Sequence, residues 1–218
     1  MKILSVSDQV EDRIYELVPQ GHFRGAAVVL GCGDLPFDYL EYLVTVMNVP
    51  VFYVPGNHDP AYQANLDGGQ AAGCTNLDLR TALFRDVLLA GFGGSIRYRP
   101  GAVNQYTQGE AYRRAARLIP VLLRNRQRHG RALDILISHS PPFGVHDDDS
   151  SAHRGLKAIN WLLQWAKPRV HLHGHMHDMH RNLKPSVTWV GTTAVMNVFP
   201  HRVVELPDDG SPVRESQL

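Results

Sequence analysis

The sequence has few cysteines, no long apolar run and no excess of either charge. Only two of its 218 residues are cysteine, Cys32 and Cys74, which is too few for a framework of disulfides. A reducing compartment is therefore the simpler expectation. The N-terminal stretch MKILSVSDQVED is less apolar than a signal peptide, and no window approaches the roughly 20 apolar residues of a membrane-spanning helix. We expect a cytoplasmic protein that does not engage membranes.

Charge balance argues against a broad electrostatic binding surface. The chain carries 22 basic and 21 acidic side chains, so neither nucleic acid nor a membrane surface is an expected partner. One local basic stretch, residues 113–131, interleaves arginines with apolar side chains at helical spacing. We interpret it as the solvated face of a helix in preference to a nucleic-acid patch.

Short apolar runs alternate with amphipathic stretches along the chain. Because no repeat and no flexible linker interrupts them, this alternation predicts a single layered α/β domain over residues 1–218. Helices are predicted over 11–18, 37–47, 108–129 and 156–166, with a kink or break at Pro120. Strands are predicted over 2–6, 26–30, 51–54, 87–90, 134–138, 170–173, 187–190, 194–198 and 203–206, and the last dozen residues are expected to be a loose end.

A histidine-rich stretch, residues 171–180, reads HLHGHMHDMH. His171, His173, His175 and His177 alternate, so an extended chain would point all four side chains the same way. Neutral imidazole is the commonest metal ligand among side chains, although a run of histidines can also be a solvated tract that binds metal weakly. The remainder of the chain has to distinguish these two possibilities.

Polar side chains that can bind a metal follow five of the predicted strands. In open α/β sheets, functional groups gather beyond the carboxyl ends of the strands. Carboxylate, amide and imidazole are the donors that borderline divalent metals take. The five strand ends continue as SD at 7–8, GCGD at 31–34, PGNHD at 55–59, SH at 138–139 and HGHMH at 173–177. Five such groups in register favour a shared metal centre over five unrelated helix caps or surface residues.

These motifs resemble the calcineurin-like metallophosphoesterases. That family's pattern runs Asp-x-His, Gly-Asp-x-x-(Asp/Glu), Gly-Asn-His-(Asp/Glu), a lone His and Gly-His-x-His. The resemblance implies an α/β fold, a four-layer α/β/β/α sandwich of two mixed β-sheets flanked by helices, with a dinuclear metal centre between the loops. The counterparts here are Asp8, Gly33-Asp34, Gly56-Asn57-His58-Asp59, His139 and Gly174-His175-Met176-His177.

The resemblance also implies which side chains hold the metals. Two metals about 3.5–4 Å apart can share a hydroxide, lower its pKa and hold phosphate oxygens for in-line attack. Mixed oxygen and nitrogen ligands without thiolate suit Mn, Fe, Zn or Ni and do not choose between them. The implied ligands are Asp34, bridging both metals; Asn57, His139 and His175 at the second metal; and Asp8 and His177 at the first.

The remaining residues of the motifs would act around the metals. His58 would lie beside the substrate phosphate, where it would stabilise the transition state or protonate the leaving oxygen, and Asp59 would orient its ring. The alternative for His58 is a further metal ligand. His173 is expected to be buried behind the site, and His171 and His180 to be structural or solvated.

One position departs from the family pattern. The family has a histidine two residues after its first aspartate, where this chain has Val10. Valine has no donor atom, so we expect the first metal to bind weakly rather than to be absent, because three protein ligands and water still suit a catalytic metal. A replacement ligand could come from Gln9, Glu11, His146 or His153.

The expected function is metal-dependent hydrolysis of a phosphodiester or a small phosphomonoester through the metal-bridging hydroxide, so the expected partner is a small phosphate ester. An alternative is a weakened member of the fold that binds a protein partner, as the retromer scaffold subunit does. A member of the fold that has lost its metals should have lost several of the ligand residues together. Since the GNHD, lone-histidine and GHMH elements are intact, we prefer the enzyme.

Overall fold

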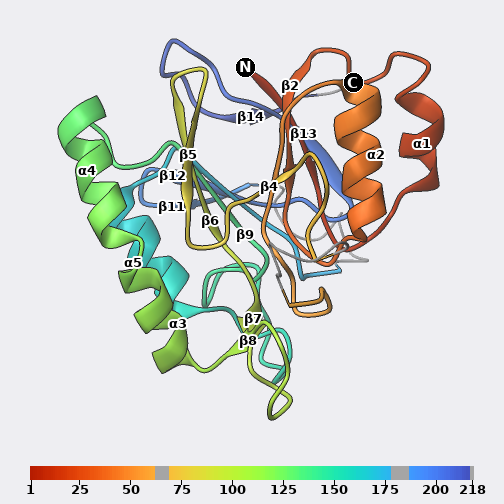
Figure 1. Ribbon diagram of the computed structural model, residues 1–218. Coiled ribbons are helices and arrows are strands. Elements are labelled where there is room, and N and C mark those ends of the chain that lie inside the picture. The colour runs from red at the N-terminus through yellow and green to blue at the C-terminus, as the bar shows by residue number, and fades with distance from the viewer. Residues whose placement is uncertain (62–68, 178–186, 217–218) are drawn as a thin grey trace.

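Two six-stranded mixed sheets form the centre of the computed structural model, which describes residues 1–61, 69–177 and 187–216 (Figure 1). The first sheet runs in the order β14 (Arg214–Glu215), β13 (His201–Glu205), β1 (Lys2–Val6), β2 (Ala26–Gly31), β3 (Val51–Tyr53) and β4 (Thr75–Asn76). The second runs β11 (Thr188–Val190), β12 (Thr193–Asn197), β10 (Val170–His173), β9 (Ile135–Ser138), β6 (Val87–Phe92) and β5 (Thr81–Phe84).

The strands that carry the motifs run parallel within their own sheet. Strand β1 pairs in parallel with β2, and β2 with β3; in the second sheet β9 pairs in parallel with both β6 and β10. Parallel strands end at the same edge of a sheet, so the segments that follow them gather there. A separate two-stranded parallel pair, β7 (Ser95–Ile96) with β8 (Gln105–Tyr106), lies beyond the end of β6.

Helices cover the outer face of each sheet. Helices α1 (Asp12–Leu17) and α2 (Phe37–Met47) lie against the first sheet, and α3 (Gln108–Ala116), α4 (Ile119–His129) and α5 (Lys157–Ala166) against the second (Figure 1). One apolar cluster fills the space between the sheets, and two more lie under the helices. The layers are therefore α/β/β/α, as the family resemblance implied. No helix in the described ranges has the length and apolarity needed to cross a bilayer.

Two features differ from the sequence-based expectations or refine them. The predicted helix over 108–129 is broken, because α3 ends at Ala116 and α4 starts at Ile119, with Pro120 in the first turn, where its missing N–H is not needed. The prediction of a loose C-terminal end is wrong for residues 213–216. Val213 is buried, and β14 pairs antiparallel with β13, because this edge of the first sheet offers unpaired backbone groups.

Candidate metal centre

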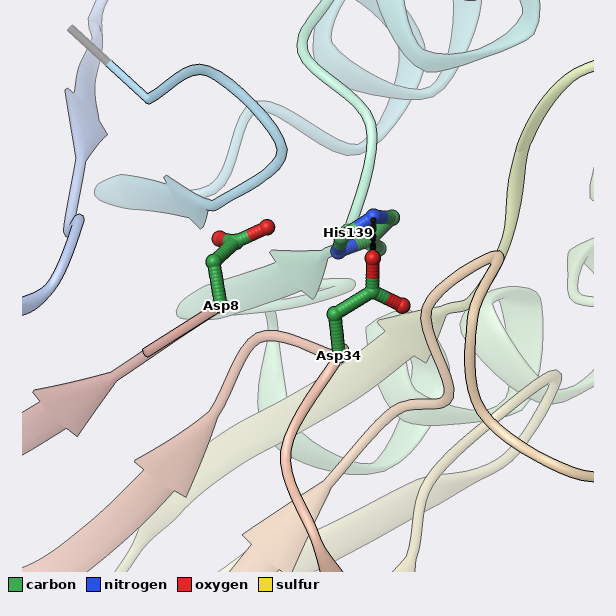
Figure 2. Close-up of side chains that lie close together, drawn as sticks. All are labelled: Asp8, Asp34 and His139. Carbon is green, nitrogen blue, oxygen red and sulfur yellow. Dashed lines mark ion pairs between the residues drawn. The ribbon is translucent and has the colours of Figure 1, made fainter. Parts of the chain in front are cut away.

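The carboxyl ends of strands from both sheets bring three predicted ligands together. Asp8 follows β1, Asp34 follows β2 and His139 follows β9, and one ligand atom from each lies within 4.8 Å of the other two. Figure 2 shows the Asp34 carboxylate directed at the His139 ring, with Asp8 on the neighbouring strand end. Two side chains thus come from the first sheet and one from the second, so the site spans the seam between the sheets.

Three further donor atoms surround Nε2 of His139. Oδ1 of Asn57 lies 3.0 Å away, Nδ1 of His175 lies 3.1 Å away and Oδ2 of Asp34 lies 3.3 Å away. Metal–nitrogen and metal–oxygen bonds of about 2.0–2.2 Å require donor atoms at about this mutual separation. The set therefore has the size of a cage for one cation.

Backbone carbonyls fix which nitrogen of each ring faces this cage. A carbonyl oxygen only accepts hydrogen bonds, so His139 donates from Nδ1 to the oxygen of Cys32 at 2.9 Å, and His175 donates from Nε2 to the oxygen of Ala152 at 2.8 Å. In the neutral rings, the nitrogens that face the cage then carry lone pairs. Two such lone pairs, an amide oxygen and a carboxylate repel one another unless a cation lies among them, so the residues fit a divalent metal.

The charges of the site favour a cation. Burial disfavours a charge on His139, but the carboxylates of Asp34 and Asp8 outweigh it and raise the pKa of His139 to about 9. Burial alone would raise the pKa of Asp34, yet His139 lowers it to about 2. Burial and the neighbouring His139 lower the pKa of His175 to about 4, so this ring is neutral at pH 7. A divalent metal in the same field would replace the proton of His139, because metal binding displaces protons from its ligands.

Asp8 and His177 form the other half of the predicted centre. Nε2 of His177 lies 3.1 Å from Oδ1 of Asp8, and this hydrogen bond is the main reason why the pKa of His177 is raised. Oδ2 of Asp8 accepts from the backbone N–H of His175 at 2.9 Å and from the hydroxyl of Ser7. The ring of His177 stacks on Phe199, with centroids 4.7 Å apart. Asp8 thus ties the end of β1 to the segment after β10.

Val10 packs against the apolar core, and three of its possible substitutes have other partners. The Val10 side chain packs against the apolar cluster under α1 and α2. Glu11 pairs with His201, His146 bonds to His173 and Thr188, and His153 bonds to Ser150 while its ring lies 5.3 Å from that of His175. The Gln9 side chain is exposed.

His58 lies at the open side of the cage. Its side chain is 68% exposed, and its Nε2 is 4.0 Å from Oδ2 of Asp34. The predicted contact between Asp59 and the His58 ring is not formed within the described residues. Oδ2 of Asp59 instead accepts from the backbone N–H groups of Asp34, at 2.9 Å, and Gly56, at 2.7 Å. Asp59 therefore fixes the backbone beneath the cage.

Three of the predicted ligands adopt a left-handed backbone conformation. The φ angles are 66° at Asp8, 54° at Asp34 and 67° at His175, each of which costs on the order of 1 kcal/mol or more for a residue with a side chain. Close packing accompanies this strain, since a Cβ atom on Gly174 would overlap Ser7 and Asp8. Sequence motifs carry no signal for this backbone strain.

The other histidines of the 171–180 stretch lie behind the site. His171 and His173 are fully buried, and Nε2 of His173 is 2.8 Å from Nδ1 of His146. His173 is therefore placed as predicted, whereas His171 is structural rather than solvated. His180 lies outside the described residues.

Sequence reasoning missed several contacts that shape the site. The carbonyls of Cys32 and Ala152 act through the backbone, which leaves no sequence signature. The hydroxyl of Tyr98 accepts a hydrogen bond from Nδ2 of Asn57 at 3.2 Å, although the segment around Tyr98 carries no recognisable motif.

Comparison with known proteins identifies the family. Residues 7–179 match the calcineurin-like phosphoesterase family. Because the match covers most of the chain, the protein belongs to this family, which uses divalent metals and whose members include phosphate ester hydrolases.

Individual relatives are distant. The uncharacterized protein MJ1162 of Methanocaldococcus jannaschii is 24% identical over 188 residues, which cover 80% of this chain and 78% of that protein. The crystal structure of TT1561 from Thermus thermophilus superposes with a TM-score of 0.57 at 17% identity, covering 90% of this chain and 88% of that one. An archaeal phosphodiesterase superposes over the whole of both chains with a TM-score of 0.53 at 13% identity. At these identities the structural likeness shows the shared fold.

Proposed function

We propose that this protein is a metal-dependent phosphoesterase that hydrolyses a phosphodiester or a small phosphomonoester. The observation that carries the proposal is the cage around Nε2 of His139, where an amide oxygen, a second imidazole nitrogen and a carboxylate oxygen lie 3.0–3.3 Å from that nitrogen. When bound, divalent metals supply Lewis acidity, which lowers the pKa of a water nucleophile and offsets the charge of the phosphate oxygens.

The residues divide into two metal-binding groups. Asn57, His139 and His175, together with Asp34, would hold the metal of the cage. Asp8 and His177 would hold the other metal, with Asp34 shared between them. The group of Asp8 and His177 has one donor fewer than the family pattern because of Val10, so its metal should be bound more weakly than the metal of the cage. The donor chemistry suits Mn, Fe, Zn or Ni.

His58 is the residue placed to act on the substrate. Its ring is largely exposed on the open side of the cage, while its backbone N–H donates to Oδ1 of Asp34 at 2.8 Å. An imidazole held beside the metal ligands can stabilise charge on a phosphate or protonate the leaving oxygen. Asp59 would support this by fixing the loop that carries His58.

Turnover with defined metals tests the proposal. Metal-free protein should be supplied separately with Mn, Fe, Zn, Ni and Mg and tested on aryl phosphodiesters and phosphomonoesters. We expect hydrolysis with at least one metal, and we expect Asp34→Asn to lose most of the rate and to retain less metal. The matched control is Asp208→Asn, whose carboxylate is 93% exposed beside the N-terminus, at the start of β1 and away from the cage. Unchanged turnover in Asp34→Asn would refute the proposal.

A metal-free scaffold that binds a protein partner is the second candidate, and the observation in its favour is Val10. Metal content and turnover measured on a single purified sample distinguish the two functions. A scaffold should contain no stoichiometric metal and show no turnover after metal is added, whereas the enzyme should show both.

A further inference from the structure

We infer that Tyr98 positions Asn57 for metal binding by holding its amide with the oxygen turned into the cage. This inference rests on the proposed function. It assigns a role to a residue outside the family motifs, on the segment that joins β7 to β8.

The amide of Asn57 can serve the metal in only one of its two orientations. Its oxygen has lone pairs for a cation, whereas its NH₂ group has only donor hydrogens. Oδ1 lies 3.0 Å from Nε2 of His139, inside the cage, and Nδ2 points out of the cage to the hydroxyl of Tyr98 at 3.2 Å. Asn57 is 8% exposed, so without the Tyr98 hydroxyl its NH₂ group would lose this partner in a largely buried place.

The segment that carries Tyr98, and Gly94 just before β7, are bonded to the loop of Asn57 at two other points. The side-chain NH₂ of Asn104 donates to the backbone oxygen of Asp59 at 3.1 Å, and the backbone N–H of Gly94 donates to the oxygen of Pro55 at 2.8 Å. These two bonds therefore hold both ends of the loop against the chain on either side of β7.

A buried glutamine fixes Tyr98 within its own segment. The backbone N–H groups of Tyr98 and Arg99 both donate to Oε1 of Gln105, at 3.2 and 3.1 Å, and Gln105 is almost fully buried. The Tyr98 hydroxyl therefore stands at a fixed place beside Asn57, and its effect on the metal passes through that amide.

Metal affinity measured directly tests this role. Metal-free protein is titrated with Mn and with Zn by calorimetry, and the tighter binding step is compared between variants. Removing a partner that orients a metal ligand typically costs 10–100-fold in affinity, so we expect Tyr98→Phe to weaken this step by about tenfold. Tyr112→Phe is the matched control, since Tyr112 lies on α3 with its ring 6.3 Å from that of Trp161, and its affinity should equal that of the natural protein.

A second background separates positioning from a general structural effect. In Asn57→Asp either carboxylate oxygen can serve as the metal ligand, so the side chain does not have to be held in one of its two orientations. Tyr98→Phe should then leave the affinity of the Asn57→Asp protein unchanged. An equal loss in both backgrounds, or no loss in the Asn57 background, would overturn the role of Tyr98 while leaving the proposed function intact. A natural protein that takes up no divalent metal would overturn both.

Discussion

Histidines in this chain differ in what each ring nitrogen touches. His139 and His175 each donate from one nitrogen to a backbone carbonyl and turn the other toward the cage. His173 donates from Nδ1 to the oxygen of Gly174 at 3.0 Å, so its other nitrogen accepts from His146. The histidines that precede and follow Gly174 therefore have different roles, although their sequence context is similar.

His58 should be needed for chemistry and dispensable for metal. Its exposed ring lies 4.0 Å from Asp34 and outside the 3.0–3.3 Å cage around His139. We expect His58→Ala to keep its metal content by elemental analysis while kcat falls by about 100-fold or more, the usual range for a lost general acid. Asn57→Ala is the comparison, and it should lose metal and rate together. Loss of metal in step with the rate in His58→Ala would make His58 a ligand.

His171 should make the protein less stable in mild acid. Its Nε2 lies 2.7 Å from the hydroxyl oxygen of Ser138, whose own proton goes to the oxygen of Ser140, so His171 donates and its Nδ1 is unprotonated. This Nδ1 is buried without a partner in the described structure. Burial and the nearby His146 lower the pKa of His171 to about 3.

The pH dependence follows from that shift. The folded pKa lies below the unfolded value of about 6.5, so the unfolded chain binds the extra proton first. The contribution of His171 to stability is complete above about pH 6.5 and is lost as the pH falls toward 3. In His171→Phe, the slope of the unfolding free energy between pH 6 and 4 should shrink by about 1.4 kcal/mol per pH unit. Urea unfolding of metal-free protein measures it, with the exposed His22→Phe as control, and equal slopes in the natural protein and His171→Phe would contradict it.

We propose that the loop after β1 limits the strength of the metal site at Asp8 and His177. Asp8 is held there by Ser7 and the backbone of His175, whereas Val10 turns its side chain to the apolar cluster under α1 and α2. Titration of the metal-free protein should therefore show two unequal steps. Val10→His should tighten the weaker step if the new imidazole leaves the apolar cluster for Asp8, and Val10→Ala should not. Two equal, tight steps in the natural protein, unchanged by Val10→His, would point to a replacement ligand.

Elements with a strong local signal could be predicted from the sequence, and those that depend on distant partners could not. The spacing of apolar residues predicted β1 and α2 with the bounds that the structure has, and Pro120 predicted the break between α3 and α4. Strand β14 and the pair β7–β8 are only two residues long, too short for a period to show, and they form because a sheet edge or a loop is already present. Tyr98 was missed because its role depends on a contact with Asn57, a residue distant in the sequence.

At the scale of the whole molecule, the site exists because two sheets end at one place. The strands of each sheet join segments that are far apart in the chain, in the orders β14-β13-β1-β2-β3-β4 and β11-β12-β10-β9-β6-β5. This order could be predicted only from the family resemblance. The core between the sheets includes Ile3 from one end of the chain and Val204 from near the other. We propose on this basis that residues 1–218 form a single domain.

The position of a bound metal tests the central claim most directly. Crystals grown with Mn or Zn should be measured at wavelengths on both sides of the absorption edge of that metal. We expect the strongest anomalous peak among Asp34, Asn57, His139 and His175, with a weaker or partly occupied second peak between Asp34, Asp8 and His177. A fully loaded protein whose only anomalous peaks lie at other histidines would contradict the assignment of the strand ends as a metal centre.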